Sequence, residues 1–258
     1  MSMKPQVYKD ERPPGYFTRF HERTRSRRPD WVYDVARLVL TPLMVFVFRN
    51  RCIDSDRVPR EGAAIIAPNH FSSLDHFLVA VYLPRKVHFM AKSQLFKRPM
   101  QFIFTHGGVF PVRRGHRDEE AFVTARDVIG RGELVVMYAE AGRSRTGELG
   151  EPRPGLGRLA LETGAPIVPT AIAGSEKARN WIRLRFPKVT VKYGAPLRFE
   201  RVESPTREQS QAASEHVFEE VRKLYEELRG QGRRGAVQSA RAARRPEAAG
   251  RRTAVPRS

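Results

Sequence analysis

The stretch Ile65–Phe77, which reads IIAPNHFSSLDHF, decides the fold class because it carries a buried strand directly into a helix. Its apolar run ends at Pro68, and the serines that follow are of the type that caps helices. Asp75 then falls in the first turn of the expected helix. A strand that passes into a helix through so short a turn is typical of an α/β domain.

The same alternation of short apolar runs and helical segments continues along the chain. Strands are expected at residues 63–67, 87–90, 109–112, 134–138, 167–172 and 189–193, and helices at 74–83, 119–130, 155–163 and 206–228. Strands separated by helices of about ten residues favour parallel pairing. The predicted fold class is therefore α/β, a single domain with a mixed, largely parallel sheet flanked by helices.

The composition excludes several classes of protein. The chain has 258 residues, of which 40% are hydrophobic, and this is enough for a globular core. Its single cysteine, Cys52, excludes an intramolecular disulfide, and the absence of any continuous apolar stretch of about 20 residues excludes a multi-span membrane protein. The formal net charge of +19 indicates an anionic partner, which is nucleic acid, an anionic membrane surface or a phosphorylated small molecule.

Charge and hydropathy divide the chain into four segments. Residues 1–30 are expected to be basic and irregular, and residues 230–258, with eight arginines and one glutamate, to be a disordered basic tail. Residues 31–52 are expected to form a membrane-associated helical segment, because their apolar run is flanked by arginines and is too short to span a bilayer. The alternative is an amphipathic helix packed on the core. Residues 53–229 form the expected α/β domain.

His70 and Asp75 are the first candidate pair for chemistry. They lie five residues apart across the strand-to-helix turn, a spacing that lets the carboxylate fold back toward the imidazole. An aspartate that accepts the Nδ1–H of a histidine fixes its tautomer and leaves Nε2 free as a base. The alternative is purely structural, with His70 capping a turn and Asp75 satisfying the helix N-terminus.

Charged residues follow two further strands. Arg113 and Arg114 end the apolar run of GGVFPVRRG, and guanidinium groups of this kind bind phosphate oxygens. The run LVVMY is followed by Glu140, Gly142 and Arg143, where a small-residue turn lets the backbone approach a ligand and Glu140 could orient Arg143 or a substrate hydroxyl. The alternatives are a solvated basic turn and a charged loop with a local salt bridge.

Taken in order, these segments resemble the glycerolipid acyltransferases that acylate glycerol phosphate and lysophosphatidic acid. The matching blocks are Asn69, His70 and Asp75, then Gly108–Arg114, then Ala139–Ser144, and then Pro166–Pro169. The resemblance covers about residues 31–200 and implies a glycerol-3-phosphate acyltransferase-like fold, with the acyltransferase domain at 53–229. The third block departs from the family pattern, because Ala139, Ala141 and Gly142 replace its Pro, Gly and Thr.

The resemblance implies an O-acyltransferase in which His70, oriented by Asp75, removes the proton from a free hydroxyl of a lysophospholipid. The acyl donor would be acyl-CoA or acyl-carrier protein, and the acceptor 1-acylglycerol-3-phosphate, giving phosphatidic acid without an acyl-enzyme. Arg114 and Arg143 would hold the phosphate, with Arg113 as a secondary candidate. The expected place is the cytoplasmic face of the cell membrane, bound to its anionic surface.

No cofactor is implied, and no metal site is predicted, because the remaining histidines lack the paired spacing of a zinc site. Two other functions stay open at this point. One is a catalytically silent homologue that only binds lipid. The other is a basic nucleic-acid-binding protein, which is not expected because the body of the chain has no basic–aromatic stacking motif.

Overall fold

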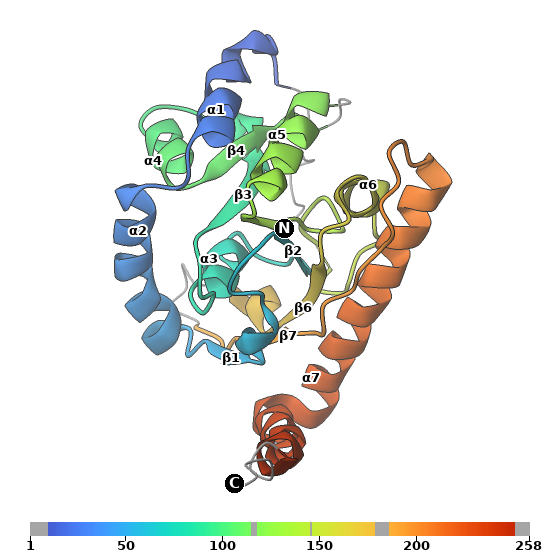
Figure 1. Cartoon of the computed structure of the whole chain (residues 1–258). Helices are drawn as coiled ribbons and strands as arrows, with labels where there is room; N and C mark the ends of the chain where they lie inside the picture. The colour runs from blue at the N-terminus through green and yellow to red at the C-terminus, as the bar shows by residue number, and fades with distance from the viewer. Residues whose placement is uncertain (1–9, 115–117, 145, 179–185, 251–258) are drawn as a thin grey trace, which may run out of the picture.

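The computed structural model describes residues 10–114, 118–144, 146–178 and 186–250, the last seven of these by their backbone only. A seven-stranded sheet runs through this part of the chain in the order β1-β7-β6-β2-β5-β3-β4 (Figure 1). The strands are β1 (Arg51–Ile53), β2 (Ala64–Pro68), β3 (Val87–Lys92), β4 (Val109–Val112), β5 (Leu134–Val136), β6 (Ile167–Ala173) and β7 (Thr190–Tyr193).

Neighbouring strands are parallel except for β6 and β7, which pair antiparallel. The prediction of a mixed, largely parallel sheet is therefore confirmed. Parallel strands have their carboxyl ends at one edge of the sheet, which is where α/β proteins place their sites. The residues that follow β2, β4 and β5 thus come together although they are far apart in the sequence.

Helices cover both faces of this sheet. The α-helices are α1 (Gly15–Ser26), α2 (Trp31–Pro42), α3 (Asp75–Ala80), α4 (Met100–His106), α5 (Glu119–Gly130), α6 (Pro154–Thr163) and α7 (Arg207–Gly250). The short helices are η1 (Leu43–Val47), which is a π-helix, and the 3-10 turns η2 (Ser55–Arg57) and η3 (Ser93–Leu95).

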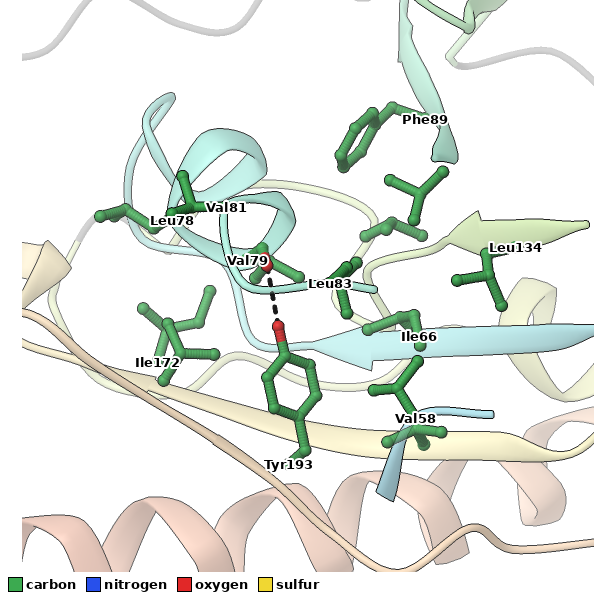
Figure 2. Packing of buried hydrophobic residues seen from close by; sticks show 14 of the residues in the cluster. Val58, Ile66, Leu78, Val79, Val81, Leu83, Phe89, Leu134, Ile172 and Tyr193 are labelled. Atoms are coloured by element: carbon green, nitrogen blue, oxygen red, sulfur yellow. Dashed lines mark hydrogen bonds between the residues drawn. The ribbon is translucent and has the colours of Figure 1, made fainter. Parts of the chain in front are cut away.

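Alternation along β2 divides the core into two layers, because successive side chains of a strand point to opposite faces. Ile66 packs in the cluster that α3 and η1 cover, whereas Ile65 packs in the cluster under α5, α6 and α7. Figure 2 shows the first cluster, in which the Tyr193 hydroxyl donates to the Val79 carbonyl over 2.8 Å. This bond ties β7 to α3 inside the core.

The expectation of an irregular segment over residues 1–30 is wrong for Gly15–Ser26, which forms α1. Phe17, Phe20, His21 and Thr24 are buried, and this spacing places them on one helical face. The two phenylalanines pack against Phe96, and α1 lies against α5 and β4 (Figure 1). The arginines between these positions make the segment polar in composition, and this hides the helical period of its buried residues. Residues 1–9 lie outside the described residues.

The apolar segment after residue 30 is helical, as expected, and runs through α2 and η1. It ends earlier than the predicted boundary at residue 52, because β1 begins at Arg51 and pairs with β7. A three-residue edge strand has too few positions to show an alternating pattern. Within the described residues, no helix combines the length and the apolar character needed to cross a membrane.

The predicted disordered tail from residue 230 is wrong as far as residue 250, because α7 continues to Gly250 past a non-helical Gly232. Ala236 is buried, and Val237 and Ala240 pack beside it against the cluster of Tyr225. Alanines bury little surface each, so composition alone underestimates a helix that docks through them. Residues 251–258 lie outside the described residues.

Candidate functional site

The His70 turn, residues 69–75, joins β2 to α3 at the carboxyl edge of the sheet. The side-chain amide of Asn69 pairs with the backbone of Ile172 in β6, as a neighbouring strand would. Its Oδ1 accepts from the Ile172 N–H over 2.7 Å, and its Nδ2 donates to the Ile172 carbonyl over 3.1 Å. These bonds fasten the turn to β6. The site therefore begins on a rigid part of the sheet.

Asp75 organises the rest of this turn through a single oxygen. Its Oδ2 lies 2.9 Å from His70 Nδ1 and accepts the backbone N–H groups of Phe71 and Ser72, each over 2.7 Å. Asp75 is fully buried, and His70 is 4% exposed. With Nδ1 held against the carboxylate, Nε2 is the ring nitrogen left to act on a substrate. The structure thus brings together the two residues predicted to form the base.

Glu140 holds the second turn of the site, residues 139–144, which follows β5. Its Oε1 accepts the His70 N–H and its Oε2 accepts the Gly150 N–H, both over 2.8 Å. Burial raises the pKa of Glu140 to about 7, against the opposing effect of these two hydrogen bonds. The side chain of Glu140 therefore holds the backbone of His70 and of Gly150.

Arg114 and Arg143 come from the ends of β4 and β5 and lie close enough to His70 for their charges to lower its pKa. A Cβ placed on Gly142 would lie 3.7 Å from Arg114 Nη1, so the two turns meet there. The backbone N–H of Arg113 donates to Asp118 Oδ2 over 2.6 Å, and the Arg113 Nε is buried. The site thus unites His70 with Arg114 and Arg143.

Burial is the largest influence on His70 and lowers the pKa of its imidazole. The hydrogen bond and the charge of Asp75 act in the opposite direction. A histidine with a lowered pKa is neutral at physiological pH, which is the form that accepts a proton. The electrostatics of the site therefore suit a general base.

Tyr138 and His76 complete the surroundings of His70. The Tyr138 ring stacks on the His70 ring with 4.0 Å between centroids and an interplanar angle of 23°. Its hydroxyl lies 3.0 Å from His76 Nδ1. His76 in turn lines an apolar cavity of about 480 Å³ enclosed by residues of α2, α3, β3, η3, α4 and β4. This volume is within the range of small-molecule sites.

The wall of this apolar cavity is almost entirely hydrocarbon. The side chains that line it include Leu40, Phe77, Phe89, Leu95, Met100 and Ile103. The cavity adjoins the His70 turn through Ser73, Leu74 and His76. An apolar space that ends beside a base and two arginines can hold a molecule with a long hydrocarbon part and a polar, anionic end.

Comparison with known proteins bears on the family. The family model described as Acyltransferase matches residues 49–173. A 1-acyl-sn-glycerol-3-phosphate acyltransferase of Cocos nucifera is 29% identical over 141 residues, 52% of this chain and 46% of that protein. One of Bacillus subtilis is 25% identical over 178 residues, 68% of this chain and 87% of that protein. Over this region the chain is therefore similar to glycerolipid acyltransferases.

A solved structure agrees in fold. The crystal structure of the 1-acyl-sn-glycerophosphate acyltransferase PlsC from Thermotoga maritima superposes with a TM-score of 0.56 at 20% identity. The match covers 81% of this chain and 88% of that chain. The predicted fold class is thereby confirmed. The family model and the names of the sequence relatives agree with the predicted resemblance to O-acyltransferases.

The two turns that touch carry five of the predicted site residues: His70, Asp75, Glu140, Gly142 and Arg143. The sequence missed Tyr138, His76 and the apolar cavity. Tyr138 is the second residue after β5, and that position at the end of a buried strand was the available signal. Among the described residues, no group of three or more His, Cys, Asp or Glu side chains is arranged to hold a metal ion.

Proposed function

We propose that this protein moves a fatty acyl group from a thioester donor, acyl-CoA or acyl-carrier protein, to the free hydroxyl of a lysophospholipid. The proposed acceptor is 1-acylglycerol-3-phosphate, and the product phosphatidic acid. The observation that carries this proposal is the buried His70–Asp75 pair, with 2.9 Å between Nδ1 and Oδ2. It lies between the charges of two arginines and the end of an apolar cavity.

In the proposed reaction, His70 Nε2 takes the proton of the acceptor hydroxyl while the oxygen attacks the thioester carbonyl. The tetrahedral intermediate then collapses, the C–S bond breaks, and the thiolate takes the proton back from the imidazolium. Asp75 stabilises that imidazolium through Nδ1. General-base assistance of this kind contributes roughly 10²–10⁴ in rate.

A direct transfer without an acyl-enzyme fits the state of the single cysteine. Burial raises the pKa of the Cys52 thiol to about 12, so the thiolate needed for attack is scarce at neutral pH. Cys52 also lies on β1, which is the third strand away from β2 in the sheet. The position of Cys52 therefore suits a packing residue and not a nucleophile.

Arg114 and Arg143 are the proposed ligands of the acceptor phosphate. Both act electrostatically on His70, so a phosphate held between them brings the acceptor hydroxyl near the base. Guanidinium groups stay charged at any physiological pH and bind phosphate oxygens in pairs. Gly142 leaves open the space beside Arg114 where the family pattern has a threonine.

The apolar cavity is the proposed place of an acyl chain. Transfer of a hydrocarbon chain from water into such a space is favourable by about 25 cal/mol per Å² of apolar surface buried. The half-buried imidazole of His76 stands at the end nearest His70. A chain in the cavity would therefore present its thioester, or its ester, toward the base.

An anionic membrane surface is the proposed location of the protein. Large apolar side chains stay exposed along α2, η1 and α4, among them Trp31 at 63%, Leu38 at 74% and Phe46 at 76%. Such a helix face, with basic residues beside it, suits insertion into the headgroup region. Replacement of Trp31, Leu38 and Phe46 by Ser should abolish sedimentation with anionic vesicles. Unchanged sedimentation would exclude this surface.

The decisive experiment uses the full chain, labelled acyl-CoA or acyl-carrier protein, and a panel of lysophospholipid acceptors. We expect an ester product from wild type and from His216→Ala, a control histidine on the exposed side of α7, and loss of at least about 10²-fold in His70→Ala. An inactive wild type with every donor and acceptor would refute acyl transfer. Wild-type activity in His70→Ala would refute the base.

A further inference from the structure

His76 and the hydroxyl of Tyr138 have no part in the proton transfer described above, yet both lie directly beside the base. We propose that Tyr138 is a positioning residue for His70, with its ring stacked on the imidazole and anchored through its hydroxyl by His76. This inference rests on the proposed function, since it requires His70 to act as the base. It assigns a role to two residues that the sequence motifs leave out.

The stack is close and buried. The centroids of the Tyr138 and His70 rings are 4.0 Å apart at 23°, Tyr138 is 9% exposed and His70 4%. Contact between stacked aromatic rings is favourable beyond the area that they bury. Asp75 holds one edge of the imidazole and Tyr138 covers one face. Together these contacts leave the ring little freedom to rotate.

The hydroxyl of Tyr138 is fixed in turn by His76. Burial lowers the pKa of His76 to about 3 and raises that of Tyr138 well above its usual value, so both groups are neutral at pH 7. A neutral imidazole accepts through the nitrogen that bears no hydrogen. The Tyr138 hydroxyl and His76 Nδ1 thus share a neutral hydrogen bond of 3.0 Å, whose direction is set by the His76 tautomer.

His76 is itself wedged between aromatic rings. It packs edge-on against Tyr138, with 5.0 Å between centroids at 82°, and against Phe89, with 5.4 Å at 79°. Phe89 belongs to β3, so the anchor of the Tyr138 ring reaches a strand on the far side of β5 from β2. The orientation of Tyr138 is thus set by the sheet as well as by its own strand.

The stack also matters for charge, because His70 becomes a cation during the reaction. The face of a tyrosine ring attracts a cation placed over it. The groups that surround His70 are Asp75 and His76 from α3, Tyr138, Glu140 and Arg143 after β5, and Arg114 after β4. The two arginines disfavour the imidazolium, so Tyr138 assists Asp75 in opposing them.

Substitutions at residue 138 test the proposal in the full chain with acyl-CoA and lysophosphatidic acid. Tyr138→Leu removes the ring, and kcat should fall roughly two- to thirtyfold with little change in KM. The acid limb of the kcat/KM profile should move to lower pH, because an imidazolium that has lost the ring is easier to deprotonate. Tyr138→Phe keeps the ring, so that limb should stay in place.

Tyr193→Phe is the matched control. It removes another buried tyrosine hydroxyl, which donates to the Val79 carbonyl inside the core, away from His70. We expect it to lower the midpoint of thermal unfolding while kcat and the acid limb remain at the wild-type values. Should Tyr193→Phe reduce kcat as much as Tyr138→Leu, the effect at residue 138 would be one of packing and the proposal would be wrong.

A fluorinated series decides the matter if Tyr138→Leu does not fold. Phenylalanine and its mono-, di- and trifluorinated forms at residue 138 have nearly the same shape, but the negative charge of the ring face falls with each fluorine. The pKa of His70, followed by NMR, should fall stepwise through the series. A constant pKa would refute the proposal. With a constant pKa of His70, an inactive His70→Ala would leave the proposed function standing. An active His70→Ala would refute both the proposed function and the role of Tyr138.

Discussion

The two turns that form the site stand side by side at the sheet edge but are built differently. In the His70 turn, residues 69–75, one carboxylate oxygen of Asp75 gathers an imidazole and two backbone N–H groups from its own neighbours in sequence. In the Glu140 turn, residues 139–144, the carboxylate binds outward, to His70 and to Gly150. The carboxylate of Asp75 thus binds residues of its own turn, whereas the carboxyl group of Glu140 binds residues of other segments.

This difference explains where the chain departs from the family pattern. All family residues of the first block, Asn69, His70 and Asp75, are present, and each makes a bond on which the turn depends. In the third block the pattern changes at three positions, Ala139, Ala141 and Gly142, whose side chains make no hydrogen bond, while Glu140 and Arg143 remain. A turn held from outside tolerates changes between its anchors.

The largest effect should follow from Asp75→Asn. The amide oxygen can take the place of Oδ2 and keep the backbone bonds, but it carries no charge to stabilise the imidazolium. We therefore expect a folded protein whose kcat is on the order of 10³–10⁴-fold lower, measured by steady-state acyl transfer. A change of less than tenfold would contradict the role of the carboxylate.

Asp30→Asn provides the control for this substitution. Asp30 caps α2 by accepting the Val32 N–H over 3.0 Å and takes no part in the His70 turn. Asparagine caps a helix about as well as aspartate, so Asp30→Asn removes mainly the charge that pairs with Arg23 and His106; it should cost at most about 1 kcal/mol of stability and leave kcat close to wild type. The comparison separates an aspartate that caps a helix from one that also serves a base.

The next effect concerns pH and the Glu140 turn. The pKa of Glu140 is raised from 4.5 to about 7, so the folded protein keeps a proton that the unfolded chain releases above pH 4.5. The free energy of unfolding should therefore fall as the pH rises from about 4.5 to about 7, by up to about 3 kcal/mol. Glu140→Gln does not titrate and should lack this slope, measured by urea unfolding at several pH values.

Glu133→Gln should behave in the opposite sense. Hydrogen bonds from His88 and Arg131 outweigh burial and lower the pKa of Glu133 to about 2. Its stabilisation is present above pH 4.5 and is lost as the pH falls toward 2, so the difference between wild type and Glu133→Gln should shrink on acidification. If the free energy of unfolding of Glu140→Gln and of Glu133→Gln showed the same pH dependence, the raised pKa of Glu140 would be refuted.

The sequence predicted best the elements and contacts that are set by residues close together in the chain. The strand 109–112 and the helix 119–130 have the predicted bounds, and the strand expected at 134–138 is found at 134–136. The His70–Asp75 contact follows from a five-residue spacing across one turn. In each of these cases the information lies within a few residues.

The rest depends on pairs that are distant in sequence. Tyr138 and His76 meet only because β5 lies beside β2, and no local pattern states which ring covers which. The helix beyond residue 230 docks through Ala236 and Val237 onto residues of other segments, so its arginine content suggested disorder. The apolar cavity is lined by residues of six separate elements, α2, α3, β3, η3, α4 and β4, and has no motif of its own.

The smallest effect should come from Ala141, where the Glu140 turn departs from the family glycine. Its φ of 51° lies in the left-handed region, which costs a residue with a Cβ about 1–2 kcal/mol. Ala141→Gly relieves this strain but adds unfolded-chain entropy, so a net gain of about 0.5–1 kcal/mol is expected in urea unfolding. Ala139→Gly, two residues away and without a positive φ, should instead destabilise by about 1 kcal/mol.

Because Ala141 bonds to the Tyr138 carbonyl and not to the His70 turn, the kcat of Ala141→Gly should stay within about twofold of wild type. A larger change in kcat would mean that strain at residue 141 is transmitted to His70, and the two turns would then have to be treated as one unit.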